Sequence, residues 1–99
     1  MKFKPTLEIA KNSINQCVEE YNKRFREELT IEDLEQLKIK YEKLYKSSSE
    51  DYLENFELYT IVEIVLIVME VLCLDKVKNI SLSEEELEIA AQELYERWA

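Results

Sequence analysis

The longest apolar run in the chain is IVEIVLIVMEVLCL, Ile61 to Leu74, in which only Glu63 and Glu70 are charged. Seven of the residues from Ile61 to Val71 are β-branched, a composition that favours strands. Strands are usually about five or six residues long, however, and no turn signal flanks this run. A strand is the alternative, and we predict that the run belongs to a long helix.

Glycine and proline, which form many tight turns, are nearly absent from the whole chain. Its 99 residues include no glycine and one proline, Pro5, whereas average usage would give about seven glycines and five prolines. Tight hairpins and phosphate-binding loops need glycine because they need positive φ angles. The composition therefore favours helices and excludes the glycine-rich motifs of nucleotide-binding and hydrolase folds.

Several helix starts are specified by local sequence. Thr30 with Asp33 forms a capping box, and Ser83 with Glu86 forms another; each box is flanked by a leucine pair in the positions of a hydrophobic staple. Thr6 can cap an earlier helix. Apolar residues recur at intervals of three and four after each of these starts, which predicts amphipathic helices.

These signals predict an all-α chain with a four-helix bundle-like arrangement, in a single domain that covers residues 1–99. The expected helices cover residues 6–28, 31–46, 50–78 and 84–98. Ser47, Ser48 and Ser49 are candidate N-caps for the third helix, and Asn79 is the nearest candidate for a left-handed cap at its end.

The third helix is long and apolar around most of its circumference, so it must be covered on most sides. Three arrangements would cover it: burial among the other helices, a seam with a second copy in a homodimer, or a groove or ridge that binds a different protein. The candidate residues for self-association or another interface are Ile61, Ile64, Val65, Val68 and Leu72.

The net charge of −9 is unevenly distributed. Residues 1–46 are nearly balanced, and the whole acidic excess lies in residues 47–99. Such a surface repels nucleic acid and anionic membranes, so we expect a protein partner with a basic surface. The candidate residues for this acidic partner surface are Glu54, Glu57, Glu84, Glu85 and Glu88. The alternative is that the acidic half only keeps the protein soluble.

Residues for catalysis or metal binding form no recognisable motif. The chain has no histidine, and Cys17 and Cys73 form no Cys-x-x-Cys pair. We expect both thiols to be buried as small apolar groups. Glu63 and Glu70 are a heptad apart, and ion pairs with a neighbouring helix or a solvated seam explain them better than acid–base chemistry. We therefore expect no catalytic, metal-binding or cofactor-binding residue and no enzyme activity.

The chain shows no sign of export or membrane insertion. Glu8, Lys11 and Asn12 interrupt the place where a signal peptide would have its apolar region. The apolar run of 61–74 is too short and too charged to cross a hydrocarbon core of about 30 Å. We expect a soluble, cytoplasmic protein.

The sequence predicts a small acidic, non-enzymatic protein that binds another protein, as an adaptor, an inhibitor or an immunity-type factor. The alternatives are a nucleic-acid mimic that occupies a basic DNA- or RNA-binding site, and a structural subunit of a larger assembly. The segment from Ile80 to Leu87 is similar to the start of the last helix in four-helix immunity proteins. The similarity covers this one helix start, consists of capping residues and implies no family membership.

Overall fold

The computed structural model describes residues 6–47 and 50–98. Within these ranges the chain forms four helices and two very short strands, so the prediction of an all-α fold is confirmed. In chain order they are α1 (Leu7–Arg24), β1 (Leu29–Thr30), α2 (Ile31–Ser47), α3 (Tyr52–Val71), β2 (Lys76–Val77) and α4 (Glu84–Trp98). The β-branched residues of the apolar run are helical, as predicted.

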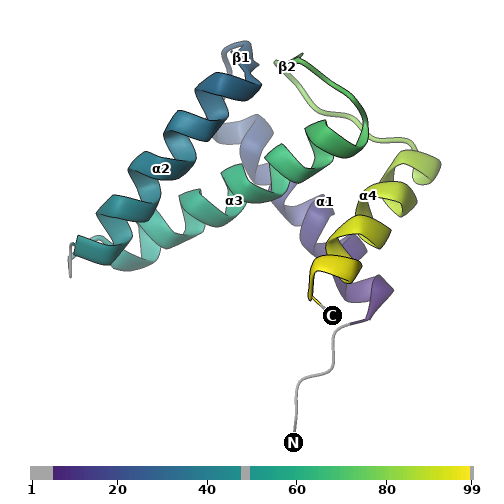
Figure 1. Cartoon of the computed structure of the whole chain (residues 1–99), viewed down its shortest axis with the longest axis horizontal. Helices are drawn as coiled ribbons and strands as arrows, with labels where there is room; N and C mark the ends of the chain where they lie inside the picture. Colours follow the sequence, from purple (N-terminus) through teal and green to yellow (C-terminus); the bar gives the residue numbers. More distant parts are fainter. Residues whose placement is uncertain (1–5, 48–49, 99) are drawn as a thin grey trace, which may run out of the picture.

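The four helices pack in two layers as a flat, bundle-like arrangement, as predicted (Figure 1). Its extents are 41 × 37 × 20 Å, and the shortest is about the thickness of two helices. α2 lies along α3, while α1 crosses behind the C-terminal half of α3 and α4 packs beside α1. α3 is therefore the central element that joins the two halves of the molecule.

The predicted caps at the starts of α1, α2 and α4 are confirmed by hydrogen bonds, whereas the third helix begins at Tyr52 instead of residue 50. The Asp33 amide donates to Thr30 Oγ1 at 3.1 Å, and the Thr30 amide donates to Asp33 Oδ2 at 3.0 Å. Ser83 and Glu86 make the same reciprocal pair at 2.9 and 3.1 Å. Thr6 accepts a hydrogen bond from the Ile9 amide. Each cap satisfies backbone donors that the first turn of a helix cannot pair internally.

Of the three serines predicted as N-caps of the third helix, only Ser47 can be compared with the structure. Ser48 and Ser49 lie outside the described residues, and Ser47 belongs to α2, where its hydroxyl donates to the Lys43 carbonyl. Asp51 occupies the N-cap position of α3, and its side chain makes no capping hydrogen bond.

The predicted end of the third helix at residue 78 is wrong, because α3 stops at Val71. Cys73 adopts a φ of 57°, the left-handed conformation usually taken by glycine. The Leu74 amide donates to the Met69 carbonyl at 2.8 Å, and the Cys73 amide donates to the Glu70 carbonyl at 3.3 Å. This pair of bonds is the Schellman motif, so Cys73 takes the role that the sequence had suggested for Asn79.

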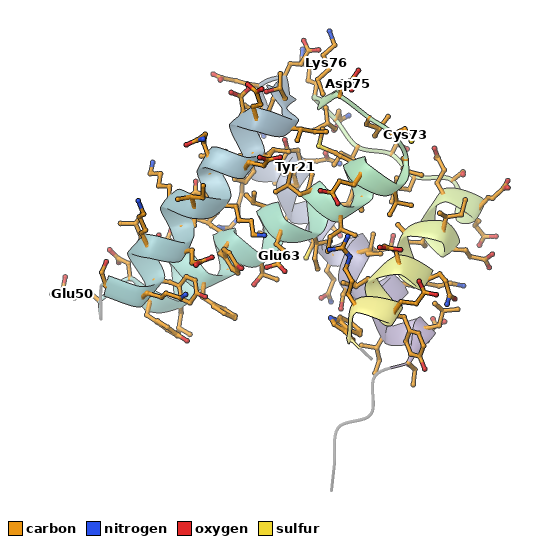
Figure 2. All side chains as sticks on the ribbon, in the orientation of Figure 1. Tyr21, Glu50, Glu63, Cys73, Asp75 and Lys76 are labelled. Carbon is orange, nitrogen blue, oxygen red and sulfur yellow. The ribbon has the colours of Figure 1, made fainter. Side chains whose placement is uncertain are left out.

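The first helix also ends earlier than predicted, at Arg24 instead of residue 28. Beyond it, Leu29 pairs with Val77 and Thr30 with Lys76 in the two-residue antiparallel ladder of β1 and β2. A longer α1 would carry Leu29 away from this partner. The ladder needs no glycine because it joins two distant loops rather than the arms of a hairpin, and Figure 2 shows Asp75 and Lys76 beside the start of α2.

A second connection between distant segments comes from Asn22 of α1, which contacts the loop between α3 and α4. Its Nδ2 donates to the Ile80 carbonyl at 2.8 Å, and its Oδ1 accepts from the Ile80 amide at 2.9 Å. The side-chain amide thus satisfies both backbone groups of a buried residue. This contact holds the loop between α3 and α4 against α1.

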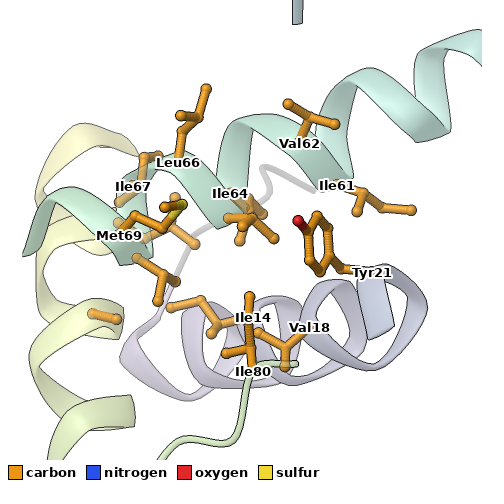
Figure 3. Close-up of a cluster of buried hydrophobic side chains, with 14 of the residues drawn as sticks. Ile14, Val18, Tyr21, Ile61, Val62, Ile64, Leu66, Ile67, Met69 and Ile80 are labelled. Carbon is orange, nitrogen blue, oxygen red and sulfur yellow. The ribbon is translucent and has the colours of Figure 1, made fainter. Parts of the chain in front are cut away.

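The core is centred on the C-terminal half of α3 (Figure 3). Every residue from Ile61 to Met69 except Glu63 is buried. Ile14, Val18 and Tyr21 of α1 pack against this half, as do residues from the other helices and from the loop at Ile80. This half of α3 therefore has the central, buried arrangement, the first of the three alternatives for covering it.

Candidate functional site

The end of the molecule farthest from α4 is a two-helix arm, which consists of α2 and residues 52–59 of α3 (Figure 1). Tyr45 of α2 lies among three aromatic rings of α3. Its ring centroid is 5.9 Å from that of Tyr52, 5.2 Å from that of Phe56 and 5.3 Å from that of Tyr59. Aromatic pairs at these separations attract one another beyond simple burial, so this cluster joins the two helices of the arm.

α3 exposes apolar side chains on the arm. Leu53 is 79% exposed and Phe56 is 43% exposed. Helical spacing places them in one stripe with Thr60, Ile64 and Ile67. Ile64 and Ile67 are buried in the core. The same stripe is therefore covered at its C-terminal end and open at its N-terminal end.

A groove follows this stripe between α1 and α3. It consists of two hollows of about 320 and 300 Å³ that share Gln16, Cys17 and Thr60 in their linings. Phe56 lies at one end of the groove, and Trp98 of α4, which is 39% exposed, lies at the other. We call this feature the α3 groove.

The α3 groove is acidic. Glu20 of α1 and Glu57 and Glu63 of α3 line it, and among residues 6–47 and 50–98 no lysine or arginine lines either hollow. Arg24 bridges two of these carboxylates from outside, with Nε 3.2 Å from Glu20 and Nη2 3.2 Å from Glu57. α3 contains no lysine or arginine, so the charged side chains that α3 itself contributes at the open end of the stripe, Glu54 and Glu57, are acidic.

Cys17, on the floor of the groove, has an unreactive thiol. Burial, followed by the nearby carboxylates of Glu57 and Glu20, raises its pKa to about 11. At neutral pH such a thiol is almost entirely protonated and is a poor nucleophile. Cys73 is exposed, which corrects the expectation that both thiols are buried: its place in the loop after α3 keeps it out of the core. Both cysteines are free.

The two glutamates of the apolar run bind neighbouring side chains. Glu70 pairs with Arg97 of α4 at 3.5 Å, which is the interhelical ion pair that the sequence favoured. Glu63 accepts a hydrogen bond from the Tyr59 hydroxyl; burial first and this bond second raise the pKa of Tyr59. Both glutamates line a separate hollow of about 430 Å³ between α2, α3 and α4.

The candidate residues for self-association lie inside the molecule. Ile61, Ile64, Val65 and Val68 are buried in the core, and Leu72 is half-buried against it. Contact with a second copy through these five side chains would require the core to open. The exposed apolar surface of α3 lies one to three turns earlier, at Tyr52, Leu53 and Phe56.

The candidate acidic residues do not form one surface. Glu54 and Glu57 lie on the arm, whereas Glu84, Glu85 and Glu88 lie at the start of α4 on the opposite side of the molecule (Figure 1). All five are exposed. Glu57 pairs with Arg24, and Glu88 pairs with Lys11 at 3.3 Å. Glu54 and Glu57 lie near the exposed Leu53 and Phe56, and Glu85 and Glu88 lie near the exposed Ile89.

Sequence reasoning missed the apolar residues of the groove, because it concentrated on the most apolar part of α3. Leu53, Phe56 and Trp98 received no role, although the spacing of Leu53, Phe56, Thr60, Ile64 and Ile67 was visible. That spacing continues the stripe of Ile64 and Ile67 toward the start of the helix, which is the signal that could have identified Leu53 and Phe56.

Comparisons with protein-family models, curated proteins and solved structures find no match for this chain. Within residues 6–47 and 50–98, no three histidine, cysteine, aspartate or glutamate side chains are grouped as metal ligands would be. No helix in these ranges has the length and apolar character needed to span a bilayer.

Proposed function

We propose that this protein acts by binding another protein, without catalysis, through the α3 groove and the open end of its apolar stripe. The observation that carries the proposal is the exposure of Leu53 beside Phe56, at a place where the stripe continues into the groove. Large apolar and aromatic side chains exposed together are typical of protein interfaces.

A binding protein of this size would serve as an adaptor, an inhibitor or an immunity-type factor. We place it in the cytoplasm, since Cys17 and Cys73 are both free and thiols persist in reducing compartments. A subunit of a larger assembly would use the same surface for docking. The assay described next detects either kind of partner.

Nucleic-acid mimicry receives less support from the charges. A mimic needs uniform rows of carboxylates that resemble phosphates. In the acidic half, Glu57, Glu70 and Glu88 instead hold ion pairs with arginine or lysine side chains. The apolar end of the stripe at Leu53 also has no counterpart in a nucleic-acid backbone.

Leu53→Asp tests the proposal. The tagged protein would be crosslinked in its native cells, and the recovered partner would be quantified by mass spectrometry. Because Leu53 is 79% exposed, the change should leave the circular dichroism spectrum and the unfolding midpoint unaltered. Recovery should fall to about a tenth of the wild-type amount or less, the effect of losing an apolar anchor.

Ile89→Asp is the matched control. Ile89 is 47% exposed, lies on α4 and lines none of the hollows that form the groove. The Ile89→Asp substitution introduces the same charge at an apolar surface position and should leave recovery of the partner unchanged. Equal recovery with Leu53→Asp and wild type, or equal loss with both variants, would show that the stripe is not the contact surface.

A further inference from the structure

The open stripe has the dimensions of a helix-binding surface. Its members Leu53, Phe56, Thr60, Ile64 and Ile67 are spaced by three, four, four and three residues, which makes a straight ridge along one face of α3. Fourteen residues separate its ends, about 21 Å at the rise of an α-helix. A helix laid along this face would contact the exposed side chains of Leu53 and Phe56, and beyond Thr60 it would lie in the hollow that the buried Ile64 and Ile67 help to line.

The charges around the stripe define the flanks of such a helix. Glu20 and Glu57, which Arg24 bridges from outside, line the hollow that includes Phe56, and Glu63 lines the hollow that includes Trp98. Glu54 adds a further exposed carboxylate at the open end. An apolar floor between acidic edges complements an apolar stripe between basic edges.

A second copy of this chain is a poor occupant of the same surface. In a symmetric contact through the stripe, Glu54 and Glu57 of one protomer would approach the carboxylates of the other, and like charges across an interface are repelled. The whole net charge of −9 adds to this repulsion. Charge complementarity therefore favours a basic partner of a different sequence.

We infer that the α3 groove binds an amphipathic helix of a partner protein, with apolar residues at positions i, i+3 or i+4 and i+7 and with lysine or arginine on both flanks. This inference rests on the proposed function and specifies the chemistry of the partner. The helix would place its apolar stripe over Phe56, Thr60 and Cys17, and its basic residues beside Glu20, Glu57 and Glu63.

The protein contains its own reporter for this binding. Trp98 is the only tryptophan, lines one end of the groove and is 39% exposed. The probe would be a tryptophan-free synthetic peptide of about 18 residues with leucines on one helical face and lysines on its flanks. Its twin would carry glutamates in place of the lysines, and a third peptide would have the same composition without an apolar face.

The lysine peptide should shift the fluorescence of Trp98 to shorter wavelength, with saturation. It should bind at least about tenfold more tightly than its glutamate twin, since two or three ion pairs change sign. Its affinity should fall when salt is raised, because the carboxylates are partly exposed. The third peptide should produce no saturable shift.

Two pairs of variants locate the binding. Leu53→Asp should abolish the shift, and Ile89→Asp should preserve it. Glu57→Lys should weaken binding about tenfold, whereas Glu85→Lys, the same charge change at the exposed start of α4, should change it by less than about twofold. All four side chains are on the surface, so circular dichroism should show folded protein throughout.

Equal affinity for the lysine and glutamate peptides, or no shift with either, would overturn the inference. So would sedimentation of the free protein as a dimer that Leu53→Asp dissociates, because the occupant would then be a second copy. If Leu53→Asp loses the native partner and one of these results is also obtained, the proposed function stands, but its partner has a different chemistry. Retention of the native partner in Leu53→Asp would instead remove the proposed function itself.

Discussion

Tyr21 is the residue whose surroundings fit its chemistry least well. It is fully buried, stacks on Phe25 with ring centroids 4.9 Å apart, and its hydroxyl finds no hydrogen-bond partner among the described residues. Figure 3 shows the hydroxyl directed toward α3, near Ile61 and Ile64. A buried hydroxyl without a partner destabilises the folded state relative to water.

Tyr21→Phe should therefore raise the free energy of unfolding by about 1 kcal/mol. Urea denaturation at neutral pH would measure the change. Tyr52→Phe is the control: Tyr52 is exposed, so the loss of its hydroxyl should have no measurable effect. A loss of stability in Tyr21→Phe would mean that the hydroxyl has a buried partner.

The same residue should make stability depend on alkaline pH. Burial raises the pKa of Tyr21 from 10.0 to about 12, so above pH 10 its ionisation favours the unfolded chain. The contribution of the neutral hydroxyl is complete below pH 10 and is lost as the pH rises toward 12. The stability advantage of Tyr21→Phe over wild type should accordingly grow between pH 10 and 12 and stay constant below pH 9.

At the scale of single elements, the end of α3 depends on a residue that is poorly suited to its backbone. Cys73 has a φ of 57°, a conformation that is disfavoured for side chains with a Cβ and is neutral for glycine. Its thiol is free and exposed. The Schellman motif is retained by backbone bonds alone.

Cys73→Gly should stabilise the protein by about 0.5–1 kcal/mol, and Cys73→Val should destabilise it by about 1 kcal/mol or more. Thermal unfolding followed by circular dichroism would measure both. Asp75→Gly is the control in the same loop, where φ is not positive. It should lower stability slightly, since glycine there only increases the freedom of the unfolded chain. Destabilisation by Cys73→Gly would contradict the assigned cap.

At the scale of the whole molecule, two polar contacts join segments that are far apart in the sequence. The β1–β2 ladder joins the loop before α2 to the loop after α3, and Asn22 joins α1 to the loop before α4. The arm extends beyond both contacts, which leaves the apolar end of α3 without a cover. The position of the groove and the two contacts therefore both depend on how the helices pack against one another.

Asn22→Ala should destabilise the protein by about 2–3 kcal/mol, because it removes two hydrogen bonds and leaves the amide and carbonyl of buried Ile80 without partners. Urea denaturation would measure the loss, and hydrogen exchange should show faster exchange at the Ile80 amide. Asn12→Ala on the exposed face of α1 should stay within about 0.5 kcal/mol of wild type. A similar small change in Asn22→Ala would show that the contact with Ile80 contributes little to holding α4 in place.

The sequence by itself determined which segments are helical and where two of them begin. The boxes at Thr30–Asp33 and Ser83–Glu86 close hydrogen bonds within four residues, so their geometry does not depend on the rest of the chain. The β-branched part of the apolar run, Ile61 to Val71, is helical for the related reason that no glycine or proline interrupts it.

Only the tertiary structure decided where α1 and α3 end and which part of the apolar stripe is open. The end of α1 depends on the pairing of Leu29 with Val77, and the depth of the core depends on where α1 and α4 cross α3. These contacts join residues tens of positions apart, and no local pattern encodes them. Leu53 and Ile67 have the same apolar character in sequence; they differ because α1 and α4 pack against the C-terminal half of α3 and leave its first turns exposed.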